Sequence, residues 1–259
     1  MRHTLGRRWV YAALLAALAA APAVVAQDDR GRQPGERKVE PIDLPLDKPG
    51  VWTLNFRYKP PRIMTVDGFD KAGKPTKQTV WYMWYQVYNR SGEPVYFTPE
   101  FELVTKDQDG PLGKFLDGAQ PSVVDAIRKI EDPTGALNIQ TSVSISKNKI
   151  PLTPPDLPFP TVRSTYGLAV WLDVPEKAAN ANNFSIYVYG LSNGLTVKGT
   201  RADPQMVISR KALQLDFRRP TDAVRNKAFD IRVFENNGLG AEKWQYIAGP
   251  PKKNDPPKN

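Results

Sequence analysis

The sequence predicts an all-β protein, an antiparallel immunoglobulin-like β-sandwich with one short helix. Three observations predict this fold class. Apolar and polar residues alternate with a period of two in many short segments, as in strands with one buried and one solvated face. Glycine, proline and asparagine separate these segments, as they do in turns. One wet face per strand favours antiparallel sheets, and many short strands with little helix favour a sandwich.

The first 26 residues have the layout of a secretory signal peptide. Arg2, Arg7 and Arg8 make a basic start, and Val10–Val25 is an uncharged run rich in Ala and Leu. Small or apolar residues precede Gln27, as cleavage by signal peptidase requires. The run is shorter than a membrane-spanning helix needs. We therefore expect export to the periplasm or the cell exterior, with no membrane span after cleavage.

The rest of the chain divides by composition into three parts. Residues 27–50 are polar and rich in proline, and they predict a flexible linker. Residues 51–248 carry the alternating segments and form the predicted sandwich domain. A break at residues 151–160 holds five prolines, so it is either a hinge between two domains or a crossover within one. Residues 249–259 predict a disordered basic tail.

The predicted elements follow in chain order. Alternation predicts strands within six segments, namely Trp52–Tyr58, Val95–Leu103, Leu168–Val174, Phe184–Tyr189, Leu213–Phe217 and Phe229–Phe234. Val80–Tyr88 predicts a further strand, which is apolar on both faces. Asn193-Gly194 predicts a hairpin turn before a strand at Leu195–Lys198. Asp107–Gly110 predicts a tight turn at the end of another strand. One helix is expected over Pro121–Ile130, because Val123, Val124, Ile127 and Ile130 fall on one stripe.

The side-chain inventory excludes several kinds of chemistry. The chain has no cysteine, and its single histidine, His3, lies in the predicted signal peptide. The processed protein would therefore lack thiolate nucleophiles, imidazole bases and the usual soft metal ligands. Gly190–Gly194 matches the pattern of a hydrolase nucleophile elbow, but a strand follows and no histidine base exists. We expect no catalytic residue, metal or cofactor.

The segment Val80–Tyr88 is apolar or aromatic on both faces. Trp81, Met83 and the residues in phase with them lie on one face, and Val80 and the residues in phase with it lie on the other. Either the strand is buried on both sides, or one face is an exposed aromatic platform that stacks on sugars, bases or a partner protein. The second interpretation makes a set of aromatic residues candidate ligand contacts: Tyr82, Trp84, Tyr88, Tyr187 and Tyr189.

Basic residues gather in the last quarter of the chain. Residues Arg201–Asn259 include 12 basic and 7 acidic side chains. Four of them flank one predicted strand and are candidate anion-binding residues: Arg210, Lys211, Arg218 and Arg219. Such a cluster binds anionic polysaccharide or lipid headgroups, or it is a solvated surface. The chain holds no motif for sequence-specific binding of nucleic acid.

Glu100 and Glu102 are the best candidates for paired acids. On one strand face their Cα atoms lie about 6.5–7 Å apart, near the lower end of the carboxylate separation in inverting glycosidases. Those enzymes place the two acids on opposite sides of a cleft, whereas here both lie on one strand. A solvated strand face is the simpler interpretation.

Three stretches of the chain resemble exported bacterial β-sandwich-type proteins to which no activity is assigned. They are Trp84–Asn89 with Phe101–Thr105, Gly167–Asp173 with Phe184–Gly194, and Leu213–Pro220. The resemblance covers Val51–Ile247 and implies an exported β fold but no catalytic residue.

Two functions remain open. The first is a non-catalytic binding or structural protein of the cell envelope, whose partner is a protein or a polysaccharide. It requires an exposed aromatic patch that includes Trp84, or a sheet edge open for pairing. The alternative is a carboxylate-based glycan hydrolase, which requires two acids facing each other across a cleft.

Overall fold

The computed structural model describes residues 35–69, 72–107, 110–154, 163–172, 174, 181–200, 206–219, 231–235 and 240–249. The predicted signal peptide at residues 1–26, residues 27–34 of the predicted linker and the tail beyond Gly249 lie outside the described residues. In the part of the chain that the structure describes, no helix is both long and apolar enough to cross a membrane.

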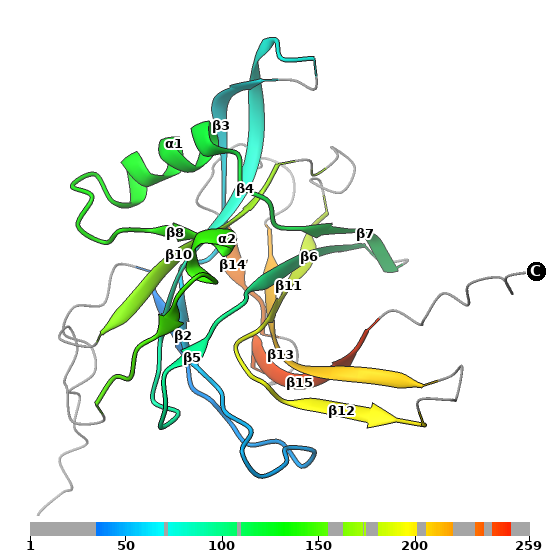
Figure 1. The fold of residues 1–259 in the computed structure, drawn as a ribbon. Helices are drawn as coiled ribbons and strands as arrows, with labels where there is room; N and C mark the ends of the chain where they lie inside the picture. The colour runs from blue at the N-terminus through cyan, green and yellow to red at the C-terminus, as the bar shows by residue number, and fades with distance from the viewer. Residues whose placement is uncertain are drawn as a thin grey trace, which may run out of the picture.

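The chain is mostly β, as the alternating pattern predicts, and its strands form two large sheets (Figure 1). Sheet 1 has the order β1-β2-β4-β10-β8, with β3 also paired to β4. Its strands are β1 (Arg37–Val39), β2 (Asn55–Tyr58), β3 (Arg62–Phe69), β4 (Pro75–Tyr88), β8 (Gln140–Thr141) and β10 (Ser164–Trp171). The long strand β4 organises this sheet, because β2 and β3 pair with successive parts of it and β10 pairs along its other side.

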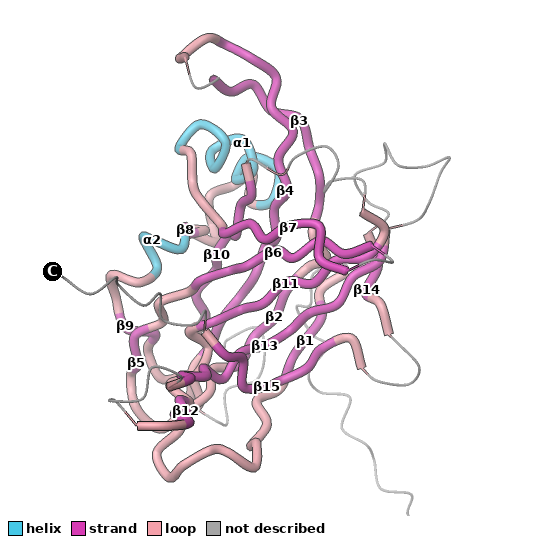
Figure 2. Tube along the Cα trace, turned by 90° about the vertical axis from the view of Figure 1, so that its right-hand side faces the viewer, coloured by secondary structure: helices cyan, strands magenta, loops and turns pink. Residues whose placement is uncertain are grey.

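Sheet 2 has the order β12-β13-β11-β6-β7, with β14 and β15 paired to β13. Its strands are β6 (Glu100–Asp107), β7 (Gly110–Leu116), β11 (Asn183–Tyr189), β12 (Leu195–Lys198), β13 (Val207–Arg218), β14 (Arg232–Val233) and β15 (Glu242–Ala248). Every pair in this sheet is antiparallel. Figure 2 shows β6, β11, β13 and β15 side by side.

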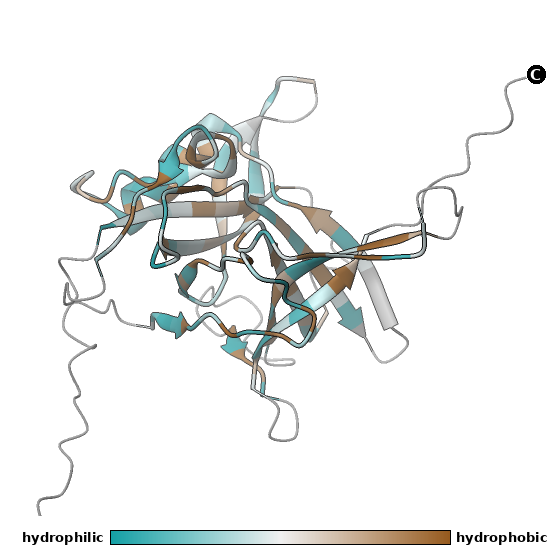
Figure 3. Ribbon diagram, turned by 60° about the horizontal axis from the view of Figure 1, so that its bottom comes forward, coloured by the Kyte–Doolittle hydropathy of each residue, from teal (hydrophilic) through white to brown (hydrophobic). Residues whose placement is uncertain are grey.

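The inner faces of the two sheets share one hydrophobic core. Apolar and polar residues alternate along the strands, coloured brown and teal in Figure 3. The apolar rings meet between the sheets, with centroid distances of 5.2 Å for Trp81–Phe184, 6.0 Å for Tyr58–Phe217 and 4.8 Å for Tyr85–Phe101. A two-stranded ribbon of β5 (Val95–Tyr96) and β9 (Lys149–Ile150) adds Val95 and Ile150 to this core.

A second core lies on the outer face of sheet 1, under helix α1 (Pro121–Glu131). Val123, Val124 and Ile127 of the helix pack with residues of β4 and β10. The helix matches the prediction for Pro121–Ile130, since Pro121 begins it and basic residues occupy its last turn. Ile130 is an exception to the predicted stripe. Its side chain is 52 % exposed, and the helix instead buries Glu131 at its end.

The predicted hairpin at Asn193-Gly194 is wrong. β11 and β12 do not pair; both run antiparallel to β13, one after the other along the same side. A type I′ hairpin turn needs positive φ at its two central residues, but here the positive φ of 85° belongs to Gly190. A Cβ at Gly190 would lie 2.2 Å from the carbonyl oxygen of Thr98. This bend separates β11 from β12, and both strands pair with β13.

Other segments also differ from the predictions. Part of the predicted linker forms β1, and Val39 is buried against the core. Asn55 and Arg57, expected on a solvated face, are buried, and Arg57 Nη1 lies 3.3 Å from the carboxylate of Glu36. The single predicted strand Val95–Leu103 is two strands, β5 and β6. The turn expected at Asp107–Gly110 is present, and it joins β6 to β7, because Asp107 and Gly110 pair at the end of the two strands.

Strands on the two sides of the proline-rich break at residues 151–160 belong to the same sheets. β10, which follows the break, pairs with β4, which precedes it. In the same way β11 pairs with β6. Each large sheet therefore contains strands from both sides of the break.

Candidate functional site

The aromatic residues of β4 do not form an exposed platform. Tyr82, Trp84 and Tyr88 are buried, and the side chain of Trp84 is only 1 % exposed. Helix α1 covers this face of the strand, so the expectation of a solvent-facing patch that includes Trp84 is wrong. Nε1 of Trp84 has no hydrogen-bond partner within the described ranges. Its ring instead lies 4.8 Å from the ammonium of Lys59, a cation–π contact.

The hydroxyl of Tyr82 belongs to a buried charged cluster at the end of α1. It donates to Glu131 Oε1 over 3.0 Å. The other partners of Glu131 are Lys59 Nζ, at 2.7 Å from Oε2, and Arg62 Nη1, at 2.7 Å from Oε1. These contacts fasten the helix to Lys59 after β2, to the start of β3 and to β4, so the cluster has a structural explanation.

Tyr187 and Tyr189 lie on the outer face of sheet 2. Tyr187 is half-buried, whereas Tyr189 is covered by the guanidinium of Arg210, which lies 4.3 Å from the ring centroid. Burial, followed by the negative charge of Glu102, raises the pKa of Tyr189 to about 12. Both tyrosines therefore stay neutral at physiological pH, and only Tyr187 offers part of its ring to solvent.

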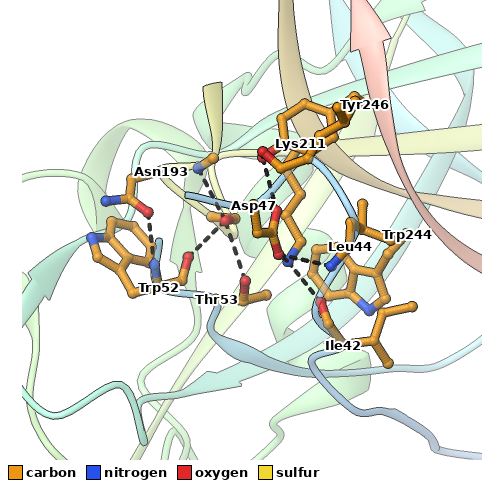
Figure 4. Close-up of polar contacts among 12 residues, drawn as sticks. Ile42, Leu44, Asp47, Trp52, Thr53, Asn193, Lys211, Trp244 and Tyr246 are labelled. Carbon is orange, nitrogen blue, oxygen red and sulfur yellow. Dashed lines mark hydrogen bonds and ion pairs between the residues drawn. The ribbon is translucent and has the colours of Figure 1, made fainter. Parts of the chain in front are cut away.

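The four predicted anion-binding residues do not form one patch. Lys211 is a buried side chain, 1 % exposed, and its ammonium donates to Asp47 Oδ2 at 2.6 Å and to the carbonyl oxygen of Ile42 at 2.7 Å (Figure 4). Tyr246 donates to the other oxygen of Asp47. Lys211 thus fastens residues 42–47 against β13 and cannot serve as a surface anion site.

Asp47 is well suited to this role. Burial by itself would raise the pKa of its carboxyl, but hydrogen bonds from Lys211, the Leu44 amide and Tyr246 outweigh that effect and lower the pKa. The neighbouring segment is fastened separately, because the amide of Trp52 donates to Asn193 Oδ1 at 2.8 Å (Figure 4).

The other three basic residues lie at the two ends of β13. Arg210 pairs with Glu100 at 3.0 Å. Arg218 lies over the ring of Phe234, and Arg219 over that of Trp81. Arg210 and Arg218 are eight residues apart on one strand, about 27 Å at ~3.4 Å per residue. A single ligand of ordinary size would not contact both ends.

Glu100 and Glu102 lie on the outer face of sheet 2, as their spacing predicts. Each has its own basic partner: Glu100 pairs with Arg210, and Glu102 lies 3.4 Å from Lys114 Nζ. Both acids come from one strand, so they do not face each other across a cleft. This arrangement does not provide the acid and base of a glycosidase.

A hydrogen-bonded polar network crosses the same outer face through four strands. Ser185 Oγ of β11 accepts from Lys106 Nζ of β6 at 2.7 Å and donates to Asp216 Oδ1 of β13 at 2.5 Å. Asp216 also accepts from Gln214 Nε2 at 2.6 Å and from Lys243 Nζ of β15 at 3.0 Å. Burial favours a higher pKa for Asp216, but the bonds from Ser185, Gln214 and Lys243 outweigh it and lower the pKa. Asp216 is therefore ionised at neutral pH.

The network borders a cavity of about 300 Å³ at one end of sheet 2. The lining combines ammonium, amide, hydroxyl and carboxylate groups with phenyl rings: Lys106, Asn183, Phe184, Ser185, Gln214, Asp216, Phe217, Phe234 and Lys243. The cavity is a candidate small-ligand site formed by described residues.

Strand β12 lies toward the opposite end of the sheet. Leu195 and Val197 share one face of it, and Ile208 of β13 lies opposite Val197. These three side chains, the aliphatic patch, are 47 %, 51 % and 42 % exposed. Among the described strands β12 pairs only with β13, so its other edge carries unpaired backbone groups.

Sequence reasoning missed both of these features. The network residues come from four strands that are distant in sequence, and each looks like an ordinary polar position on a solvated face. The edge at β12 was hidden because Asn193-Gly194 indicated a hairpin that would have paired β12 with β11. The exposed alternation of Leu195 and Val197 was the available signal.

Comparisons with known proteins do not identify the chain. No protein-family model, curated protein or solved structure matches it. Within the described ranges, no group of three or more acidic or histidine side chains is placed to hold a metal ion.

Proposed function

We propose that the protein is an exported, non-catalytic binding protein of the cell envelope, built as an immunoglobulin-like sandwich, and that it binds an extended segment of a partner protein along β12. The observation that carries this proposal is the open lane, meaning the space beside Leu195–Lys198 on the side away from β13. An incoming strand there would complete the hydrogen bonds of an unpaired edge.

The open lane lies on the same side of β13 as β6, but residues 53 and 54 separate the two: Thr53 forms a bridge with Ser192, and the amide of Leu54 donates to the carbonyl oxygen of Leu191. β6 pairs with β11 and begins at Glu100, opposite Tyr189. After β11 the chain bends at Gly190 and continues as β12. β6 does not extend beside β12. Pro99 has no amide hydrogen, which stops β6 from extending further as a regular strand. The bend and the proline together leave the edge of β12 free within the described part of the molecule.

β7, the outermost strand on the same side of β13, is protected in a way that β12 is not. β7 contains Pro111, Gly113 and Lys114, and proline and lysine are the residues that natural edge strands use to prevent pairing. β12 instead presents two exposed aliphatic side chains and a single charge, Lys198. An exposed aliphatic edge of this kind is a liability unless a partner covers it.

The surroundings of β12 define the chemistry of the partner segment. Its alternate side chains would contact the aliphatic patch and should be apolar. Lys198 is exposed and has no carboxylate within ion-pair distance among the described residues. An acidic residue in the partner segment would complement this charge. We therefore expect a short extended segment in which aliphatic and acidic residues alternate.

The test is site-specific photo-crosslinking in intact cell envelopes. Benzoylphenylalanine replaces Thr196 in β12, and a matched control carries it in place of Lys114 in β7. We expect crosslinks from position 196 to one recurring segment of a single envelope protein. A second substitution, Val197→Lys, should reduce their yield at least tenfold. The control should give no such crosslink.

Three outcomes would contradict the proposal. They are the absence of any crosslink from position 196, an equal yield of the same product from position 114, and crosslinks to a glycan or to a second copy of this chain. Val197→Lys should change the free energy of unfolding by no more than about 0.5 kcal/mol, as expected for an exposed site. Loss of crosslinking therefore would not reflect unfolding.

A further inference from the structure

We infer that the cavity beside Lys106 and Asp216 binds a carboxylated sugar, a hexuronic acid residue of an acidic glycan. This site is separate from the open lane and does not depend on it. Along β13, Asp216 lies eight residues from Ile208, about 27 Å at ~3.4 Å per residue. The volume of about 300 Å³ is at the lower end of the range for small-ligand pockets, ~300–1,000 Å³.

The charges that line the cavity favour an anion. Lys243 neutralises Asp216, with its ammonium 3.0 Å from Oδ2. Lys106 is partly buried and donates to the neutral hydroxyl of Ser185. No carboxylate of the described chain lies within ion-pair distance of the Lys106 ammonium. An ammonium has three donors, and within the described chain Lys106 uses one of them on Ser185, so a ligand carboxylate can accept from the others.

Ser185 and Asp216 hold the ammonium of Lys106 in place. Ser185 is buried. Its hydroxyl donates a hydrogen bond to Asp216, so its oxygen lone pairs are left to accept from Lys106. Asp216 in turn is fixed by Gln214 and Lys243. The site is thus preorganised in the absence of ligand, which reduces the ordering entropy lost on binding.

The remaining lining matches the other parts of a sugar. Asn183 is exposed, and its amide offers both a donor and an acceptor for hydroxyl groups. Phe234 is partly exposed, with Arg218 over its ring, and the part that lines the cavity supplies an apolar surface for a sugar. A phosphate would be expected to use arginine forks or a helix N-terminus; no arginine lines this cavity, and Arg218 lies over the ring of Phe234 instead. One free ammonium with amides and a phenyl ring fits a monoanionic polyhydroxylated ligand better.

The experiment is isothermal titration of the purified protein with oligogalacturonate. A neutral oligosaccharide of the same length and inorganic phosphate serve as comparison ligands. We expect oligogalacturonate to bind, with an affinity that falls as salt is added, while the neutral sugar and phosphate bind at least tenfold more weakly. Lys106→Met should weaken oligogalacturonate binding at least tenfold. Lys114→Met, which removes a lysine from the same face outside the cavity, should leave it unchanged.

Asn183→Ala provides a second variant at an exposed position, where a folding defect is not expected, and it should also weaken oligogalacturonate binding. The inference is overturned if oligogalacturonate does not bind, or if Lys106→Met and Lys114→Met weaken binding equally. It is also overturned if phosphate binds as tightly as oligogalacturonate, because that would indicate a simple anion site. Equal binding of the neutral sugar would likewise contradict it, since the carboxylate would then have no role.

Discussion

The outer face of sheet 1 is covered by a helix, whereas the outer face of sheet 2 is partly open to solvent. On sheet 1 the outer face carries Tyr82 and Trp84, and helix α1 covers it to make a second core. On sheet 2 the outer face carries Ser185, Gln214 and Asp216, which form a hydrogen-bonded network beside a cavity. The more aromatic face is therefore the one that is closed to ligands. Aromatic content in this protein marks packing, whereas the polar face keeps the groups that can bind.

The two faces differ because exposing apolar rings to water and covering charged groups both cost free energy. Large apolar rings gain about 25 cal/mol per Å² of surface removed from water, which favours recruiting a helix over sheet 1. Charged groups lose hydration when they are covered and must find partners. On sheet 1 the covered charges are paired: Glu131 has three partners, and Arg57 lies beside Glu36. On sheet 2 partial exposure of the network avoids the same penalty.

The largest expected effect comes from opening the covered face. Trp84→Ala should lower the free energy of unfolding by about 3–5 kcal/mol, the range for truncating a buried large aromatic residue. Urea denaturation followed by far-UV circular dichroism measures it. Ile130→Ala, on the exposed side of α1, is the matched control and should change stability by no more than about 0.5 kcal/mol. Comparable effects of the two substitutions would show that α1 does not cover Trp84.

The next effect concerns the charged end of that helix. Glu131→Gln keeps the shape of the side chain but leaves the ammonium of Lys59 buried without its carboxylate. It should destabilise the protein by about 3 kcal/mol, the lower end for a broken buried pair because Arg62 is partly exposed. The same denaturation experiment tests it. Asp125→Asn breaks the exposed pair with Arg128 on the same helix and should change stability by about 0.3–0.5 kcal/mol. If both substitutions have the same small effect, the cluster does not anchor α1.

The smallest effect belongs to the open face and depends on pH. Because the pKa of Asp216 is lowered in the folded protein, its ionised form adds stability above the unfolded carboxyl pKa near 4. That stability is lost as the pH falls through the lower folded pKa. Asp216→Asn should therefore destabilise by about 1 kcal/mol at pH 7, with a difference from wild type that shrinks below pH 4.

Asp117 gives the opposite dependence and serves as a control. Burial raises the pKa of its carboxyl, so its contribution to stability is present at low pH and is lost as the pH rises through the folded pKa. Thermal or urea unfolding across pH 3–7 distinguishes the two groups. A difference for Asp216→Asn that grows on acidification would refute the assignment of Asp216 as an ionised centre of the network.

Local patterns in the sequence predicted most of the individual elements. The two faces of Val80–Tyr88 were assigned correctly, with Trp81 and Met83 in the central core and Tyr82 and Trp84 on the other side. The helix Pro121–Glu131 and the turn at Asp107–Gly110 were also found. These succeed because strand and helix periods and turn residues act over a few neighbouring positions. The hairpin predicted at Asn193-Gly194 is wrong because β11 and β12 both pair with the long strand β13 instead of with each other.

The candidate site could not be predicted in the same way. Lys211 and Arg210 are adjacent in sequence, yet one is buried against Asp47 and the other lies on the outer face with Glu100. A strand directs successive side chains to opposite faces, so a run of basic residues is divided between two environments. Lys211 is buried because residues 42–47, more than 160 positions away in the chain, cover its face of β13.

The sequence by itself determined the β-rich composition of the fold, the period of each strand, the single long helix of the described chain and the lack of thiol and imidazole chemistry outside His3. The tertiary structure decided which face of β4 is covered, which lysine is buried, and where an edge and a cavity remain open. The reason is the range of the interactions. Alternation and capping are local, whereas burial and exposure depend on strand order, which brings Lys106, Ser185, Asp216 and Lys243 together from four separate segments.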